Sequence, residues 1–314
     1  MSVAIPYQGR TAVDHVDGTG AFAIRDMVDC PGAVFFVGSN VTGASDAAGF
    51  GKEPNTPFAT LAYAETQCLT QRGDTIFIFP NHTETLSSAT GAAVLTLDVA
   101  NLRIVGLGRS TRPAFLIDGH ENNYVSITGA DTVIENVTFK AGHADIAKGV
   151  NVAAAGVAFR GCHFIENTAQ ENFLFSIQTT AAADEMLVEG CKFISIDAAA
   201  DAAIHIVGAC NGVVIRDNYF DAPYVTSAIE AITNACLDIQ IIGNYIRNIV
   251  EGDDLAGAID LVAASTGIIA NNRIYLADDT DILTCIDGGN CGKADNMSSN
   301  EFVQEAGVAA TQAA

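Results

Sequence analysis

A short phrase of polar residues closed by an apolar one returns along the second half of the chain, between residues 133 and 302. Each copy holds a turn-forming Gly, Asn or Asp, one or two further residues and then Phe or Ile. The steps between the closing residues are 25, 29, 27, 26, 28 and 28, for Phe139, Phe164, Phe193, Phe220, Ile246, Ile274 and Phe302. A repeat of this length without heptads or helical periodicity predicts a coiled β architecture.

Two further columns of short apolar segments keep the same period. One alternates apolar and polar residues, as at 125–127 and 204–206, and the other is a short apolar run, as at 133–134 and 239–241. Alternation is typical of strands with one buried face, and turns rich in Gly, Asn, Asp and Ala separate these segments. Such short strands bury their apolar face only by stacking on the next turn. We therefore predict an all-β, right-handed parallel β-helix of about nine rungs, about 43 Å long.

Stacked rungs are expected to place like side chains in ladders, about 4.8 Å apart, in which amides hydrogen-bond along the stack. We predict one amide ladder, with Cys162 and Cys191 in its register on earlier rungs, and one internal aromatic stack in which isoleucines replace Phe on two rungs. All of these side chains are interpreted as structural. The ladder is Asn218, Asn244, Asn272 and Asn300, and the stack is Phe139, Phe164, Phe193 and Phe220, with Phe302 at its far end.

The chain divides into an N-terminal arm (1–32), a capped β-helix (33–305) and a C-terminal tail (306–314). Glycine and proline punctuate the arm, and its apolar residues follow neither the helical nor the strand period for long. It is either a disordered tail or an extended arm that orders against a partner. We favour the partner, because the arm is more apolar than a free tail. The contact candidates are Ile5, Tyr7, Arg10, Phe22, Ile24 and Arg25.

A helix is predicted between two strands at the start of the β-helix. Thr56 is the expected N-cap and Pro57 the first helical residue, and the helix continues to about Thr70 and ends at Gly73. The flanking strands are expected at 33–37 and 75–79. A helix in this position would cover the open end of the rod, which otherwise exposes an unpaired strand edge.

Net charge, hydrophobicity and cysteine content argue against several classes of partner and against a metal site. The sequence has 15 basic and 37 acidic residues, a net charge of −22, which repels phosphate backbones and argues against nucleic-acid binding. There is no apolar run of membrane-spanning length and no signal-peptide pattern, so we expect no membrane partner and synthesis in the cytoplasm. The 8 cysteines lack metal-site spacing, so we expect no metal and free thiols, although a disulfide between neighbouring rungs stays open.

Residues 55–61, Asn-Thr-Pro-Phe-Ala-Thr-Leu, and residues 73–84 resemble the entry segment of pectate-lyase-like parallel β-helix proteins. Together with the repeat, the resemblance covers about residues 33 to 305. It implies the fold but not the function, because this scaffold serves lyases, hydrolases, phage tailspikes and non-enzymatic virion proteins. In particular, the chain looks like the β-helix virion proteins of tailed phages, including trimeric capsid-decorating proteins related to tailspikes.

An enzyme on this scaffold needs convergent carboxylates, with a base or a bound cation. Aspartates are expected in turns, however, and an acidic chain contains acidic clusters by chance. The Asn-Thr-Asp and Gly-His-Gly signatures of polygalacturonases and the Arg-bearing motif of pectate lyases are absent from the sequence, and His163 and His205 are expected on the surface. We therefore predict no enzyme and no cofactor. The candidates weighed are Asp118, His120 and Glu121; His143 and Asp145; Asp253 and Asp254; and Asp278, Asp279 and Asp281.

The leading hypothesis is a homotrimeric capsid decoration or cement protein of a tailed phage. It would be made in the host cytoplasm and bind the major capsid protein on the outer capsid surface, with the N-terminal arm as the clamp. One alternative is a tailspike-like depolymerase that cleaves polysaccharide in a groove along the rod. Another is a non-catalytic carbohydrate-binding tail protein.

Overall fold

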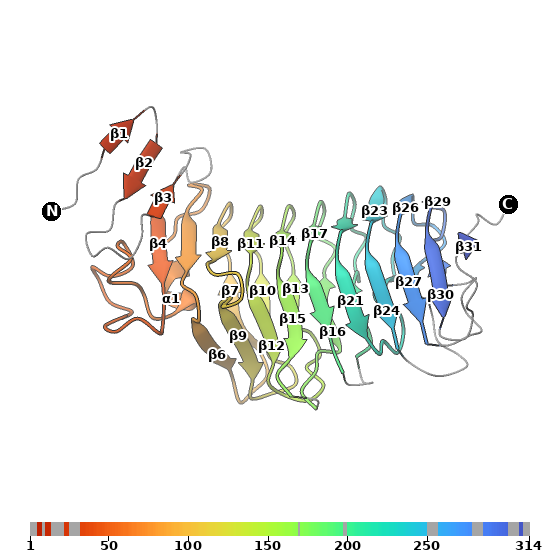
Figure 1. The fold of residues 1–314 in the computed structure, drawn as a ribbon, viewed down its shortest axis with the longest axis horizontal. Helices are drawn as coiled ribbons and strands as arrows, with labels where there is room; N and C mark the ends of the chain where they lie inside the picture. Colours follow the sequence, from red (N-terminus) through yellow and green to blue (C-terminus); the bar gives the residue numbers. More distant parts are fainter. Residues whose placement is uncertain are drawn as a thin grey trace.

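The computed structural model describes residues 32–168, 170–196, 200–249, 257–277 and 285–300, and short strands at 5–7, 10–13, 22–24 and 308–309. Over residues 34–300 the chain winds into a parallel β-helix, whose strands stack side by side from left to right in Figure 1. Three sheets run along it, two of ten strands and one of eight. The structure confirms the predicted all-β, right-handed parallel β-helix, which has about eight turns.

The three sheets are named here sheet 1, sheet 2 and sheet 3. Sheet 1 contains β4 (Val34–Val37), β5 (Thr75–Ile78), β8 (Arg103–Gly106), β11 (Val133–Glu135), β14 (Ala158–Arg160), β17 (Leu187–Glu189), β20 (Val214–Arg216), β23 (Ile239–Ile242), β26 (Gly267–Ala270) and β29 (Gly292–Ala294). Sheet 2 contains β6 (Thr83–Ser87), β9 (Ala114–Asp118), β12 (Thr138–Ala141), β15 (His163–Glu166), β18 (Lys192–Ile194), β21 (Tyr219–Ala222), β24 (Tyr245–Asn248), β27 (Arg273–Leu276), β30 (Met297–Asn300) and the antiparallel β31 (Val308–Ala309). Sheet 3 contains β7 (Ala93–Leu97), β10 (Tyr124–Ile127), β13 (Val150–Val152), β16 (Phe175–Thr179), β19 (Ala202–His205), β22 (Ile229–Ala231), β25 (Ile259–Leu261) and β28 (Ile286–Asp287).

An aromatic stack fills the core beneath sheet 2. The ring centroids of Phe139 and Phe164 lie 5.1 Å apart, those of Phe164 and Phe193 4.9 Å, and those of Phe193 and Phe220 4.8 Å. Ile246 and Ile274 continue the column, as the spacing predicts. The next position is Ser298, which pairs with Ile274, and not Phe302, which lies outside the described residues.

The amide ladder is present, but its last member differs from the prediction. Asn218 donates from its side-chain amide to Oδ1 of Asn244 at 3.0 Å, and Asn244 donates to Oδ1 of Asn272 at 3.0 Å. Asn272 then donates to Asn296 at 2.9 Å. Asn300 is therefore wrong as the fourth rung, because the register of β27 and β30 pairs it with Leu276. The final turn is four residues shorter than the repeat implies.

A short helix caps the rod near its N-terminal end, where Figure 1 places α1 beside β4. It spans Leu61–Thr66, with the Thr60 hydroxyl accepting from the Tyr63 N–H. The predicted start at Thr56 and Pro57 is wrong, because the chain around Phe58 first pairs with the edge of β4. Helical geometry begins only after that contact.

The N-terminal segment predicted as an irregular arm contains three short strands. They are β1 (Ile5–Tyr7), β2 (Arg10–Val13) and β3 (Phe22–Ile24), in one antiparallel sheet. Five of the six contact candidates, Ile5, Tyr7, Arg10, Phe22 and Ile24, belong to these strands. Arg25 lies outside the described residues.

Cysteines occupy buried positions along the stack. The seven in the described part of the chain, Cys68, Cys162, Cys191, Cys210, Cys236, Cys285 and Cys291, are free thiols. Cys191 lies in the amide register, as predicted, and its N–H donates to Oδ1 of Asn218 at 2.8 Å. A small apolar thiol therefore stands at the position where later rungs have an amide.

Candidate functional site

The outer face of sheet 3 carries a row of polar side chains at equivalent positions of successive strands. Alternation along each strand turns the neighbouring Ile177, Ile204 and Ile229 into the core and this row outward. We call it the polar row: Asn151, Gln178, His205, Glu230, Asp260 and Asp287, paired strand to strand in that order.

A lysine extends the contacts of the polar row toward the N-terminal end. Nζ of Lys148 lies 3.2 Å from Oε1 of Gln178 and 4.7 Å from the ring centroid of Tyr124. Gln178 in turn has its side-chain nitrogen 3.3 Å from Nδ1 of His205. An ammonium, an amide and an imidazole are thus held in contact across three rungs.

The series of contacts along the polar row continues from His205 to Glu230. Nε2 of His205 lies 3.5 Å from Oε1 of Glu230, and Oε2 of Glu230 accepts the Thr226 hydroxyl at 2.7 Å. The ring of Phe175 packs against the imidazole, with centroids 4.3 Å apart. Glu230 is only 2% exposed, although it points away from the core.

Burial shifts the proton affinities of these groups. It raises the pKa of Glu230, an effect that the Thr226 hydrogen bond opposes and the charges of Asp201 and Asp260 reinforce. It lowers the pKa of Lys148 and the pKa of His205, because a poorly solvated site disfavours the charged form of each group. The pKa values of the acid and the amine are therefore brought closer together, an arrangement that occurs at functional sites.

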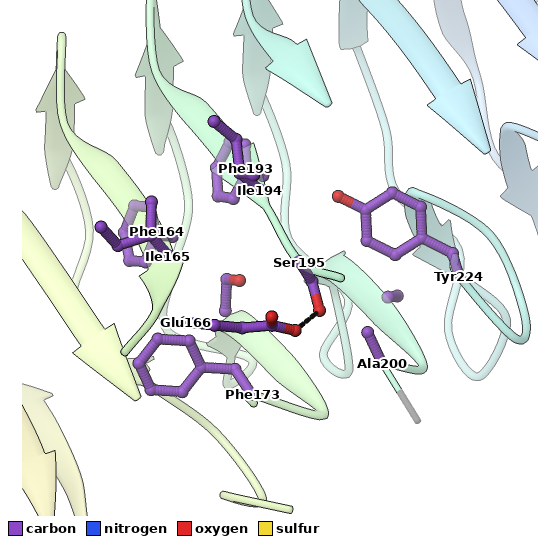
Figure 2. Close-up of a pocket in the computed structure, with 11 residues that line it drawn as sticks. Phe164, Ile165, Glu166, Phe173, Phe193, Ile194, Ser195, Ala200 and Tyr224 are labelled. Atoms are coloured by element: carbon purple, nitrogen blue, oxygen red, sulfur yellow. Dashed lines mark hydrogen bonds between the residues drawn. The ribbon is translucent and has the colours of Figure 1, made fainter. Parts of the chain in front are cut away.

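A recess opens beside the polar row, where the ends of sheet 2 strands meet the starts of sheet 3 strands. Figure 2 shows Phe173, Glu166, Ser195 and Tyr224 around it, with a hydrogen bond from the Ser195 hydroxyl to Glu166. Ser176, on the same strand as Gln178, also lines it, so the recess and the row share one edge of the rod.

The acidic and histidine candidates that lie in the described part of the chain do not assemble into this site. Asp118 ends β9, where its Oδ1 accepts the Gly119 N–H, and Nδ1 of His120 accepts the Asn122 N–H in the next turn. The remaining ones lie in turns or outside the described residues. Glu121 and Asp145 are exposed, and His143 contacts the Ala144 carbonyl; Asp253, Asp254, Asp278, Asp279 and Asp281 lie outside the described part.

Two histidines predicted on the surface are more buried than expected. The His205 side chain is only 14% exposed, because Phe175 and Glu230 cover it. His163 has the predicted register with Thr138 and Lys192, but burial lowers its pKa to about 4, with the nearby positive charges adding to the effect.

Sequence reasoning identified the strands of the polar row but gave no role to Lys148, Gln178 or Glu230. The sequence does contain a pattern that points to this row. A polar residue between two apolar ones recurs at Asn151, His205 and Glu230. This alternation predicts that the polar side chains point outward from the β-helix. It does not predict which of them contact one another.

No group of three or more His, Cys, Asp or Glu is arranged to hold a metal ion in the part of the chain that the structure describes. Within the same residues, no helix is long and apolar enough to cross a membrane.

Solved structures share the fold. A rhamnogalacturonan lyase superposes with a TM-score of 0.55 at 12% identity, covering 78% of this chain and 69% of that one. The pectate lyase Pel9A gives 0.52 at 10% identity, covering 86% and 77%. A pectate lyase from Bacillus sp. N165, solved with trigalacturonate, gives 0.47 at 14%, covering 87% and 81%. No protein-family model matches the sequence. No curated protein matches it either.

These neighbours correct one prediction. The sequence led us to predict no enzyme, and that exclusion is wrong as it stands, because the named structural neighbours are polysaccharide lyases. At 10 to 12% identity they establish the fold alone, so enzymatic activity becomes a question for experiment. The chain has the pectate-lyase-like parallel β-helix fold.

Proposed function

We propose that the chain is a tailspike-like, polysaccharide-binding β-helix protein, with the saccharide lying along the outer face of sheet 3. The observation that carries the proposal is the contact series from Lys148 through Gln178 and His205 to Glu230. Donors and acceptors recur there once per rung, about every 4.8 Å. A polymer of repeating sugar units suits a surface whose polar groups also repeat.

The composition of the face supports a carbohydrate ligand. Lys148, Asn151 and Gln178 are half-buried, and the Lys148 amine and the Gln178 amide contact each other. The half-buried rings of Tyr124 and Phe175 flank them. Ligand sites combine apolar or aromatic walls with a few placed polar groups, as this face does.

The shifted pKa values of Glu230 and Lys148 raise the question of whether the protein also cleaves a bound polysaccharide. An acid with a raised pKa keeps its proton to higher pH, and an amine with a lowered pKa gives it up more readily. Glu230 and Lys148 show these two shifts, but Gln178 and His205 lie between them, so they are separate groups of the row and not one acid–base pair. Proton transfer to and from a sugar is the step that both hydrolysis and elimination require, so a binding experiment should also measure product ends.

The test is calorimetric titration of purified protein with bacterial surface polysaccharides, together with assays for new reducing and unsaturated ends. Lys148→Met is expected to weaken binding at least about tenfold, the loss of one charge-assisted hydrogen bond, and Gln178→Ala about threefold to tenfold, the loss of a neutral one. Lys140→Met is the matched control, because Lys140 is equally half-buried but lies on sheet 2. Undiminished binding by Lys148→Met, or no binding by the wild type to any polysaccharide, would refute the proposal.

A second candidate is a homotrimeric capsid decoration protein that binds the major capsid protein of a tailed phage. The outer face of sheet 1 favours it, since apolar side chains and mutually paired charges there suit packing between copies. Electron microscopy of assembled particles distinguishes the two, because decoration places the protein on the shell and the tailspike role places it on the tail. Deleting residues 1–32 is expected to reduce shell occupancy, and unchanged occupancy would exclude the arm as the clamp.

A further inference from the structure

Three basic side chains gather on the outer face of sheet 2, where its strands begin. Strand pairing places Ala114, Thr138, His163 and Lys192 at the first position of the successive strands β9, β12, β15 and β18. Strands β9, β12 and β15 lie side by side in Figure 1. Arg112 lies two residues before Ala114, in the turn that leads into β9. We call Arg112, His163 and Lys192 the basic cluster.

The two cations of the basic cluster approach His163 from opposite sides. Stacked strands are about 4.8 Å apart, so Ala114 lies two strands, about 10 Å, from His163. Thr138 stands between them, and this short, buried side chain leaves the outer face free for the longer arginine. Lys192 lies one strand beyond His163. Both positive charges add to burial in lowering the pKa of His163 to about 4, which places them near the imidazole.

The positive charge of the basic cluster is not compensated. No carboxylate in the described part of the chain forms an ion pair with Arg112 or Lys192. The glutamates on the sheet 1 side of the same turns, Glu135 and Glu189, already lie 2.9 Å and 2.7 Å from arginines of that sheet. Since His163 is neutral at pH 7, the cluster has a charge of +2, in a chain of net charge −22.

The guanidinium of Arg112 has an unused donor. One end is oriented by the turn, because its Nη1 donates to the Arg109 carbonyl at 3.0 Å. Its Nε is buried and has no hydrogen-bond partner among the described residues. A buried donor without a partner is costly, and such donors usually meet a bound water or ion. The uncompensated charge around this donor favours an anion.

We propose that the basic cluster binds a tetrahedral oxyanion, phosphate or sulfate, between Arg112 and Lys192, with an N–H of His163 as a further donor. A dianion matches the charge of the two cations, and arginine and lysine are common ligands of phosphate oxygens. The group recognised is the same whether the anion is free or esterified to a larger molecule. The cluster lies on sheet 2 and the polar row on sheet 3, so this inference is independent of the proposed function.

The test is calorimetric titration of the full chain with sodium phosphate and with sodium sulfate, at an ionic strength held constant with chloride. Lys192→Met and Arg112→Met are each expected to weaken binding at least about tenfold, because each removes a charge-assisted hydrogen bond. Arg273→Met is the matched control and should bind as the wild type does. Arg273 is an exposed cation in the same row as Lys192, three strands further along the rod. Far-UV circular dichroism checks that every variant is folded.

The protonation of His163 gives a second readout, which a change in folding alone would not produce. Followed by nuclear magnetic resonance, the pKa of His163 is expected to rise from about 4 when phosphate replaces chloride, because a neighbouring anion stabilises the protonated ring. The rise should be smaller in Lys192→Met, which binds the anion more weakly. An unchanged pKa in saturating phosphate would contradict a site at this position.

Titration with glucose 6-phosphate, and with glucose as its control, distinguishes the two sources of the anion. Tighter binding than that of inorganic phosphate would support an esterified group on a saccharide, and equal or weaker binding would support the free anion. Absence of binding by phosphate, sulfate and glucose 6-phosphate would overturn the inference. So would an equal loss of affinity in Arg273→Met, or a folded Arg112→Met/Lys192→Met variant that binds as tightly as the wild type.

Discussion

Replacing Asn244 by alanine tests the physical basis of the β-helix. The side chain is fully buried and makes four hydrogen bonds. Its amide nitrogen donates to the Ile215 carbonyl and to Oδ1 of Asn272, each at 3.0 Å. Its Oδ1 accepts the backbone N–H and the side-chain amide of Asn218, each at 3.0 Å. Alanine removes all four.

The free energy of unfolding should fall by about 4 kcal/mol. Truncation leaves the backbone N–H of Asn218 buried without its partner, which costs about 1 to 3 kcal/mol. The remaining hydrogen bonds contribute about 1 kcal/mol each, but their partners keep other contacts: the Asn218 amide still donates to Val188, and Oδ1 of Asn272 still accepts the backbone N–H of residue 244.

Urea denaturation followed by circular dichroism measures the change. Asn234→Ala is the control, because the exposed Asn234 makes one hydrogen bond, to the Val207 carbonyl at 2.7 Å. We expect a loss of less than about 1 kcal/mol for this control. If the two variants were equally stable, the ladder would not stabilise the stack, and our reasoning about the repeat would be wrong.

Burial raises the pKa of Glu230 above 4.5, so it stabilises the fold below that pH and the contribution is lost as pH rises through the raised value. Glu230→Gln should therefore stabilise the protein at alkaline pH but not in acid, as thermal unfolding against pH would show; a constant difference would contradict this. Burial raises the pKa of Cys68 to about 12, so this thiol should stay unreactive toward a disulfide reagent at pH 8 until the protein is denatured, and labelling of native Cys68 found by mass spectrometry would refute the burial. A Cβ on Gly267 would lie 2.0 Å from the Ile239 carbonyl oxygen, whereas one on Gly161 meets nothing within 4 Å. Gly267→Ala should lower the thermal midpoint well beyond Gly161→Ala, which costs about 1 kcal/mol of left-handed backbone strain, and equal midpoints would contradict the clash.

The sequence alone determined the architecture, because stacking imposes one periodic requirement on every rung. This requirement is visible in the sequence as the regular spacing of the phenylalanines from Phe139 to Phe220 and of Asn218, Asn244 and Asn272. The three columns of strands have the same spacing and could therefore be predicted. The prediction failed at the ends of the stack. Asn296 replaced Asn300 because turn length is free to vary where no periodic contact limits it, and Phe58 joined a strand edge before the helix began.

Only the tertiary structure decided which side chains act together. Lys148, Gln178, His205 and Glu230 are separated by about one turn each in the sequence, and nothing in their order shows that their polar atoms meet. The same is true of the Arg and Glu residues on sheet 1. Periodicity fixes which face a residue occupies, because alternation is a local property of a strand. Contacts between rungs, and the burial that shifts each pKa, depend on packing around the whole turn.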